Sequence, residues 1–386
     1  MDGFTRRGLM GAAAGVAAMS ALDMGPARAA APDSLDALAK AKGFTGFGSC
    51  IGGGAEDFAS SFNDAGVRAI HERECGIAVC ENETKWVALR PNPKEYSFYL
   101  ADRVVDWAEG HGMQMRGHTL LWQKTQYFPK WLQNYDFGTR PATEAERLLR
   151  EHITTVCTHY SKRIFTYDVV NEAVDEISGE SRITPFSKLL GDATIDICFD
   201  AAHKAAPHAR LVYNDYMGWG PASAHHREGV LKLLSGLKSR KAPVHLLGVQ
   251  SHIGPGTNVE SQGPNTFGGA DQAAWKQFLD AAVAMDLRLC LTEFDVGERG
   301  TPADISERDR FIADLAHRYL DFMFAYRQTD YLMAWGMMDH YSWLQNFGGK
   351  RPDGMLKRPT LYDDNYQRKL LRQAIAEAFR SAPMRA

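Results

Sequence analysis

Two glutamates occupy matching positions in two similar segments of the chain. The segment YDVVNEA, residues 167–173, places Glu172 at the downstream end of an apolar, β-branched run, and LCLTEFDV, residues 289–296, delivers Glu293 in the same way. Runs of this kind are typical of buried parallel strands, and their polar residues come where a strand meets solvent. Two carboxylates on two strand ends are the minimum equipment for cleaving a glycosidic bond. Glu172 and Glu293 are therefore the candidate catalytic pair.

Short β-like runs alternate with amphipathic helical stretches around these two segments. Eight strand-then-helix units predict a single-domain α/β fold, the closed (β/α)8 TIM barrel. The strand candidates are residues 46–51, 76–81, 114–122, 164–172, 210–216, 246–252, 288–295 and 331–339. The helical candidates include residues 142–160, 192–206, 222–237, 272–285 and 304–327.

The alternative architecture is an open doubly wound sheet. Sheets of that kind that bind nucleotides carry a glycine fingerprint after the first strand. Here the first strand candidate is followed by Gly52-Gly53-Gly54, without the spaced glycines or the Lys-Ser/Thr pair that would cradle phosphates. We therefore prefer the barrel.

The predicted strand ends carry a concentrated set of polar and aromatic side chains. In a barrel of this kind such residues gather at one mouth. Sugar rings require this surface, because their hydroxyls need paired donors and acceptors and their C–H faces stack on aromatic planes. The candidates are Glu81, Asn82, Lys85, His118, Trp122, Asn171, Asn214, Asp215, Tyr216, Gln250, His252, Asp295, Trp335, Asp339 and Trp343.

The order of these motifs resembles that of the glycoside hydrolase family 10 endo-xylanases, from about residue 34 to residue 379. The matching pieces are ENETKW (81–86), GHTLLW (117–122), YDVVNEA (167–173), YNDY (213–216), GVQSH (248–252), LTEFDV (291–296), the Trp335–Trp343 segment and LYDDNY (361–366). Each motif is weak alone, whereas all of them in one order are specific.

The resemblance implies a retaining endo-1,4-β-xylanase that acts on xylan or xylooligosaccharides and needs no metal or cofactor. Glu172 would be the general acid/base and Glu293 the nucleophile of a double displacement. Asp295 would orient His252. The residues implied to hold the sugar on the non-reducing side are Glu81, Asn82 and Lys85. Those implied to surround the cleaved sugar are His118, Asn171, Gln250, His252, Trp335 and Trp343, with Trp122 close by and Tyr216 as a further substrate contact.

The chain departs from the family pattern directly after Trp122. The family usually continues with a His and then Gln-x-Pro, whereas this chain reads QKTQYFP at residues 123–129, with Gln123 in place of the His and two extra residues. Tyr167 replaces the usual Trp, and Met217 stands where an Asn is common. We expect the loop over the acid to be shaped differently, which leaves open whether the enzyme cuts within chains or near their ends.

Two alternatives remain open at this level. The same barrel could carry a β-1,4-glucanase, because the preference for pentose chains comes from the resemblance alone. It could also be a non-catalytic xylan-binding protein that has kept the fold, although both glutamates are present.

The first 31 residues form a separate, twin-arginine-type export signal. Arg6 and Arg7 precede an Ala/Gly-rich apolar stretch and an Ala-x-Ala site that ends at Ala29. We therefore expect a periplasmic or secreted bacterial protein, with one catalytic domain over residues 32–386. The 44 basic and 47 acidic residues give a net charge of −3. This balance, without a basic stripe or a second long apolar run, predicts no nucleic-acid partner and no membrane insertion of the mature protein, which we expect to be monomeric.

The six cysteines do not form a zinc-binding pattern. Cys157, Cys198 and Cys290 lie in apolar runs and predict buried free thiols. A disulfide elsewhere stays open, because an exported protein permits one.

Overall fold

The computed structural model describes residues 31–54, 60–255 and 267–385. Apart from its last residue, the expected export signal lies outside these ranges and stays a prediction. No helix in the described ranges is both long enough and apolar enough to cross a membrane.

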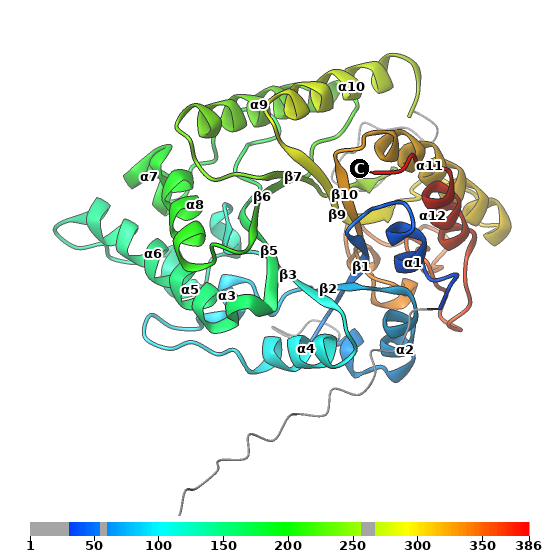
Figure 1. Ribbon diagram of the computed structural model, residues 1–386, viewed down its shortest axis with the longest axis horizontal. Helices are drawn as coiled ribbons and strands as arrows, with labels where there is room; N and C mark the ends of the chain where they lie inside the picture. Colours follow the sequence, from blue (N-terminus) through cyan, green and yellow to red (C-terminus); the bar gives the residue numbers. More distant parts are fainter. Residues whose placement is uncertain (1–30, 55–59, 256–266, 386) are drawn as a thin grey trace, which may run out of the picture.

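Eight parallel strands form a closed ring with helices outside it, as predicted (Figure 1). Strand β10 pairs with both β1 and β9, and this double pairing closes the barrel. Two short segments, β4 and β8, extend the third and sixth strands and pair with β5 and β9. The bounds are β1 Gly46–Ile51, β2 Ile77–Cys80, β3 Gln114–Gly117, β4 Leu121–Trp122, β5 Ile164–Asn171, β6 Arg210–Asp215, β7 Leu246–Val249, β8 His252–Ile253, β9 Arg288–Val296 and β10 Thr329–Ala334.

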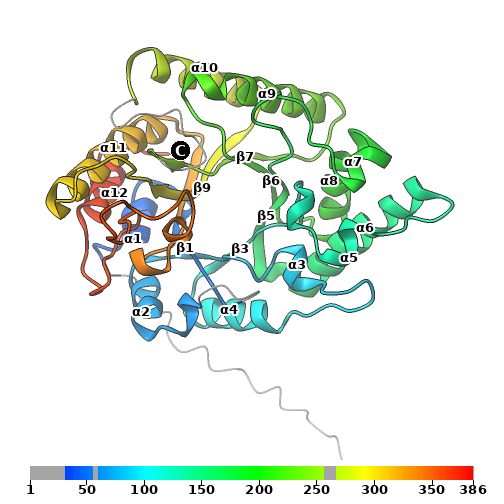
Figure 2. The same cartoon turned by 180° about the vertical axis from the view of Figure 1, so that it is seen from behind.

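One long helix follows each barrel strand and buries an apolar face against the sheet. In the third of these helices, α6, the predicted stripe of Leu148, Leu149, Ile153 and Val156 is buried. Figure 2 shows the same ring from behind. The helices are α2 Ala65–Glu74, α4 Tyr99–Gly110, α6 Pro141–Tyr160, α8 Ala193–Ala205, α9 Ala224–Ser239, α10 Gly269–Ala284, α11 Ile305–Ala325 and α12 Leu370–Ser381.

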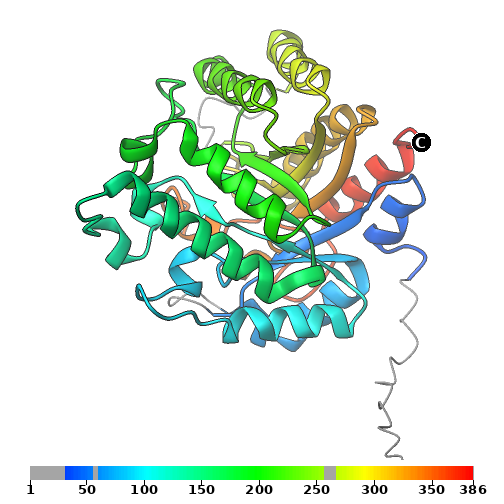
Figure 3. The same ribbon diagram turned by 60° about the vertical axis from the view of Figure 1, so that its left-hand side comes forward.

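Shorter elements lie before the barrel and in its loops. Helix α1 precedes the first strand and packs beside α12, so both ends of the described chain lie on one side of the barrel (Figure 3). The short α-helices are α1 Leu35–Lys40, α3 Trp86–Leu89, α5 Lys130–Gln133 and α7 Pro185–Leu190. The 3₁₀ turns are η2 Ser61–Asn63, η3 Thr125–Tyr127, η4 Ser161–Arg163, η5 Pro221–Ser223, η6 Asp339–Tyr341 and η7 Trp343–Gln345.

The unusual Tyr167 packs closely on the neighbouring strand. A Cβ atom added at Gly117 would lie 2.3 Å from the Tyr167 ring. Glycine at position 117 is therefore required by the ring that covers it, which makes Tyr167 a wall residue of the core and not part of the site.

The predicted eighth strand was too long at its downstream end. Residues 331–339 were expected to be extended, but β10 ends at Ala334. Gly336 adopts a φ of 105° and turns the chain out of the sheet. Asp339 consequently falls in η6 and not on a strand end.

All six cysteines are buried free thiols. Burial raises the pKa of Cys290 to about 12, so this thiol stays protonated at neutral pH. The cysteines therefore serve as small core residues.

Candidate active site

A cavity of about 320 Å³ opens at the carboxyl ends of the barrel strands. This mouth is where barrels of this type place their chemistry. All residues predicted from the sequence to be catalytic or to bind substrate line the cavity, except Tyr216 and Asp295. The lining residues are Glu81, Asn82, Lys85, Val87, His118, Trp122, Lys124, Gln126, Tyr127, Asn171, Glu172, Gln250, His252, Glu293, Trp335, Trp343 and Phe347.

Glu172 stands where the chain leaves β5. Its backbone is left-handed, with φ of 56°, and its amide still donates to the carbonyl of Asn214 at 2.9 Å. A non-glycine residue in this conformation costs about 1 kcal/mol or more, so the surrounding structure must hold it there. Glu172 is only 5% exposed. Its Oε1 accepts hydrogen bonds from Nδ2 of Asn171 at 3.2 Å and Nε2 of Gln250 at 2.9 Å.

Glu293 lies in β9 and is held from two sides. Nδ2 of Asn214 donates to its Oε1 at 2.8 Å, and Nε2 of His252 lies 3.2 Å from its Oε2. Burial opposes ionisation of this carboxyl. The hydrogen bond from His252 and the positive charges of His118, His252 and Arg116 outweigh burial and lower the pKa of Glu293 to about 2. Glu293 is therefore a carboxylate at neutral pH.

Asn214 connects the two candidate carboxylates. Its Nδ2 donates one hydrogen bond to Glu293 and the other to Oδ1 of Asn171 at 2.9 Å, and its Oδ1 accepts from the hydroxyl of Thr292 at 2.6 Å. These contacts fix the orientation of the amide. Since Asn171 in turn donates to Glu172, a short chain of amides joins both carboxylates across the mouth.

His252 lies between two carboxylates. Its Nδ1 is 2.9 Å from Oδ1 of Asp295, and its Nε2 faces Glu293. Burial opposes the charged ring, but Asp295 and Glu293 raise the pKa of His252 to about 10. His252 is therefore an imidazolium at neutral pH that donates from both nitrogens. Asp295 lies behind it and also accepts a hydrogen bond from Nε1 of Trp343 at 2.7 Å.

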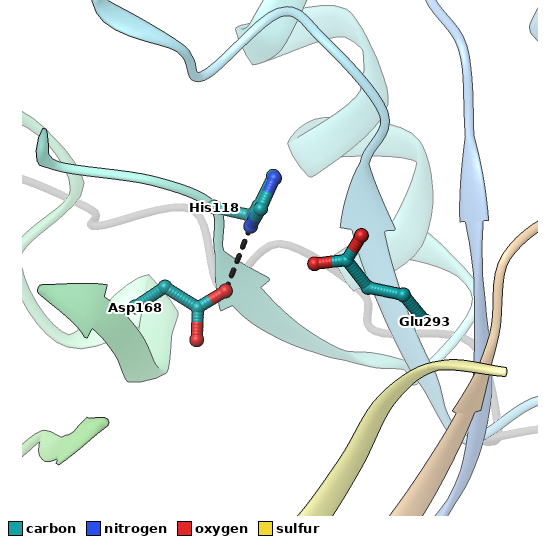
Figure 4. Close-up of side chains that lie close together, drawn as sticks. All are labelled: His118, Asp168 and Glu293. Carbon is teal, nitrogen blue, oxygen red and sulfur yellow. Dashed lines mark hydrogen bonds and ion pairs between the residues drawn. The ribbon is translucent and has the colours of Figure 1, made fainter. Parts of the chain in front are cut away.

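His118 approaches Glu293 from the opposite side of the barrel. Figure 4 shows His118 bound to Asp168, with the carboxylate of Glu293 facing them. Nδ1 of His118 lies 2.7 Å from Oδ2 of Asp168, which also pairs with the buried guanidinium of Arg116. This arrangement orients the ring of His118 and places positive charge beneath the nucleophile candidate.

The same three side chains form a group of potential metal ligands. His118, Asp168 and Glu293 offer ligand atoms that all lie within 4.8 Å of one another. However, Asp168 is already paired with Arg116, and Glu293 accepts from Asn214 and His252. A bound cation would have to displace these partners beside a fixed guanidinium, so the donor set fits an ion-pair network and does not fit a metal centre.

Glu81, Asn82 and Lys85 form one flank of the cavity. Nζ of Lys85 donates to Oδ1 of Asn82 at 2.8 Å and lies 4.8 Å from the ring centroid of Trp122. Burial lowers the pKa of Lys85 and raises that of Glu81 to about 7, although Lys85 opposes the latter shift. These three polar groups present donors and acceptors at a desolvated surface, as a site for sugar hydroxyls requires.

Aromatic rings line the cavity beside its polar groups. Trp335 meets His118 edge to face at 5.2 Å between ring centroids, and Trp343 lies 4.9 Å from His252. Trp122 stacks on Tyr127 at 3.7 Å with an interplanar angle of 15°. The cavity therefore combines flat apolar faces with hydrogen-bonding groups.

The altered segment 123–129 enters the site itself. Lys124, Gln126 and Tyr127 line the cavity, and Nζ of Lys124 lies 2.5 Å from Oε2 of Glu172. None of these three residues was predicted to be in the site, although the segment was identified as different. After β4 the chain leaves the sheet, so alternation along a strand no longer indicates which side chains point inward.

Tyr216, which the sequence analysis expects to contact substrate, lies behind the cavity lining, and its contact with substrate stays a prediction. Its ring lies beneath the ammonium of Lys124, at 4.5 Å from Nζ to the centroid. Its hydroxyl accepts hydrogen bonds from Arg182 at 2.7 Å and from Lys124 at 3.3 Å. Tyr216 therefore supports a residue that lines the cavity.

Two of the acidic strand-end candidates are also outside the cavity. Asp215 is buried, with its carboxylate bound to the hydroxyl of Tyr213 at 2.5 Å and near His226 at 3.1 Å. Asp339 pairs with Lys369 at 2.9 Å and accepts from Thr360. Asp215 therefore links β6 to helix α9, and Asp339 links η6 to the segment before α12. Asn214 comes from the same group of predicted strand-end residues. The sequence analysis did not assign it to the site, although it contacts Glu293.

The chain was compared with known proteins. The family model described as glycosyl hydrolase family 10 matches residues 34–378. Endo-1,4-beta-xylanase B of Paenibacillus barcinonensis is 31% identical over 299 residues, covering 75% of this chain and 84% of that protein. Beta-1,4-xylanase of Dictyoglomus thermophilum is 31% identical over 301 residues, covering 75% and 78%. The crystal structure of xylanase 10B from Thermotoga petrophila RKU-1 in complex with xylobiose matches with a TM-score of 0.75 at 27% identity, covering 90% and 97%.

Proposed function

The chain belongs to glycosyl hydrolase family 10, and we propose that it is a retaining endo-1,4-β-xylanase with Glu172 as acid/base and Glu293 as nucleophile. One observation carries this proposal. An amide network joins the two buried carboxylates, and positive charge keeps one of them ionised. The names of the relatives, together with the xylobiose complex of the Thermotoga petrophila enzyme, support xylan or xylooligosaccharides as the substrate.

In the first step, the carboxylate of Glu293 attacks the anomeric carbon. The bond to the leaving oxygen breaks, and a protonated Glu172 gives its proton to that oxygen. The low pKa of Glu293 supplies the ionised nucleophile. His252 holds the attacking carboxylate through Oε2, and Asn214 holds it through Oε1.

In the second step, water replaces the leaving sugar. Glu172, now a carboxylate, takes a proton from that water while the water oxygen attacks the anomeric carbon and releases Glu293. Two displacements at one carbon retain its configuration. Asn171, whose amide is fixed between Asn214 and Glu172, is placed to hold a sugar hydroxyl through both steps.

A time course on linear xylohexaose tests the proposal, with Glu172→Ala and Glu293→Ala as controls. Early release of internal fragments such as xylotriose and xylobiose, lost in both variants, is the expected result. Removal of one unit at a time would keep the mechanism and make the enzyme act at chain ends. Cleavage of cellohexaose alone would replace the proposal by a β-1,4-glucanase, and binding without turnover would replace it by a sugar-binding protein.

We also propose export to the periplasm or beyond, and a monomeric state, from the sequence alone. Fusion of residues 1–31 to a reporter that is active only after twin-arginine export tests the first proposal. Light scattering on the purified protein tests the second.

A further inference from the structure

Lys124 lies in the segment that departs from the family pattern, and it contacts the acid/base candidate directly. Its Nζ is 2.5 Å from Oε2 of Glu172, and its side chain is 20% exposed at the cavity wall. In the described part of the chain, Oε2 accepts no hydrogen bond of ordinary geometry. The ammonium of Lys124 is therefore the charged group that this oxygen meets.

The ammonium is held in place by Tyr216. It lies 4.5 Å from the ring centroid and 3.3 Å from the hydroxyl, which also accepts from Arg182. A cation over a tyrosine ring is stabilised by about 0.5–2 kcal/mol, more where water is excluded. Lys124 is thus anchored beside Glu172 by a second element of the barrel.

The other groups that face Glu172 do not duplicate this charge. Asn171 on β5 and Gln250 after β7 are neutral donors to Oε1. Lys85, after β2, interacts with Glu172 through its charge without contacting it. Glu293 on β9 carries the opposite charge. Arg182 donates to the backbone carbonyl of Glu172 and pairs with Asp175 and Glu176.

We propose that Lys124 is a positioning residue whose ammonium, held against Oε2 of Glu172, sets the upper pH limit of the reaction. The inference rests on the proposed function, because a general acid must carry a proton before the first step. An ammonium in contact favours the charged form of the carboxyl. Lys124 should therefore lower the pH at which general-acid catalysis is lost. The same contact stabilises the carboxylate that serves as base in the second step.

The pH dependence of kcat/KM on xylohexaose tests this inference in Lys124→Met. The basic limb should move up by about 1 pH unit, because contact with an opposite charge shifts a carboxyl by about 1–3 units. Lys124→Arg keeps the charge and should keep the limb near its original position. Lys130→Met removes the same charge from an exposed residue of α5, outside the cavity, and is the matched control.

An activated substrate separates this effect from a general disturbance of the site. 2,4-Dinitrophenyl β-xylobioside has a leaving group that needs little protonation, so the limb for its cleavage should not move in Lys124→Met. An unchanged limb on xylohexaose, or an equal shift in Lys130→Met, would overturn the inference.

A measurement without turnover keeps the two proposals apart. Carbon-13 NMR of labelled glutamate carboxyls, assigned with Glu172→Gln, should report Glu172 titrating at higher pH in Lys124→Met than in the parent protein. Failure to cleave xylohexaose would count against the proposed function alone. An identical titration in both proteins would count against the role of Lys124 alone.

Discussion

Asn214 at the end of β6 donates a hydrogen bond of 2.8 Å to Glu293 on β9, across the intervening strand β7. Because the other hydrogen of the same Nδ2 binds Asn171, the amide of Asn214 cannot rotate without breaking both contacts. The two proposed catalytic glutamates are thus positioned by a residue that does not line the cavity.

Asn214→Ala should lower kcat/KM on xylohexaose about 10- to 100-fold, because a hydrogen bond to a charged group contributes about 1.5–3 kcal/mol. Both kinetic constants should be measured beside the melting temperature. A loss of activity that merely follows a loss of folded protein would contradict the positioning role. Asn214→Asp adds negative charge beside Glu293 and should be more severe.

Chemical rescue should distinguish the two glutamates. Glu172→Ala should lose about 10²- to 10⁴-fold on xylohexaose, the usual contribution of general acid–base catalysis, and much less on 2,4-dinitrophenyl β-xylobioside. Azide should then yield a β-glycosyl azide by attack on the glycosyl-enzyme. In Glu293→Ala, azide should replace the nucleophile and yield the α-anomer. The same anomer from both variants would contradict the double displacement.

His252 should determine the lowest pH at which the enzyme is active. In the parent protein the pKa of Glu293 is lowered to about 2, so the nucleophile is ionised at pH 4 and above. His252→Asn removes the hydrogen bond and the charge that lower it, so the acidic limb of kcat/KM should move to higher pH. Retention of the parent pH profile between pH 3 and pH 5 would show that other groups keep Glu293 ionised without His252.

His252 should also contribute to stability in a defined pH range. Its pKa is raised to about 10 in the folded protein, against an ordinary value of 6.5. The folded state therefore binds this proton more tightly, and the resulting stability is complete below pH 6.5 and is lost as the pH rises through 10. The melting temperature of His252→Asn should lie furthest below that of the parent protein near pH 6, and the difference should narrow as the pH rises towards 10.

Tyr127 should affect binding more than chemistry. It stacks on Trp122, whose ring also carries the ammonium of Lys85. Tyr127→Ala should raise KM on xylohexaose up to about tenfold, because an aromatic pair contributes about 0.5–1.5 kcal/mol, with kcat nearly unchanged. Products of the two proteins should be separated as well. A change from internal to terminal cutting, or the reverse, would assign to this ring the control of where chains are cut.

The sequence predicted the barrel and most of the cavity wall because both follow from where the apolar runs begin and end. Apolar runs identify the strands, and the polar residues at their ends must share one mouth once the sheet closes. Residues such as Gln250 and Trp335 could be chosen on this basis. The predicted length of the eighth strand was wrong. Gly336 turns the chain out of the sheet through its backbone conformation, which an apolar pattern does not reveal.

Lys124, Asn214 and Tyr216 required the structure, for three different reasons. Lys124 follows the sheet, where a side chain's direction depends on the loop. Asn214 acts from beneath the cavity. Its position at a strand end therefore does not distinguish it from its neighbour Asp215, whose carboxylate binds Tyr213 instead. Tyr216 belongs to a matching motif, but it contacts Lys124 and not the cavity. In each case the deciding contact joins segments far apart in the chain.

The pairing of β10 with both β1 and β9 has a consequence for how this protein tolerates change. In the described part of the chain, the eight main strands are paired on both sides and only the two-residue strands β4 and β8 keep an open edge, so an intact barrel offers little template for β-edge aggregation. Insertions such as the two extra residues in segment 123–129 then change the mouth of the barrel and leave the strand pairing intact. The chain can vary its specificity loops without a matching cost in solubility.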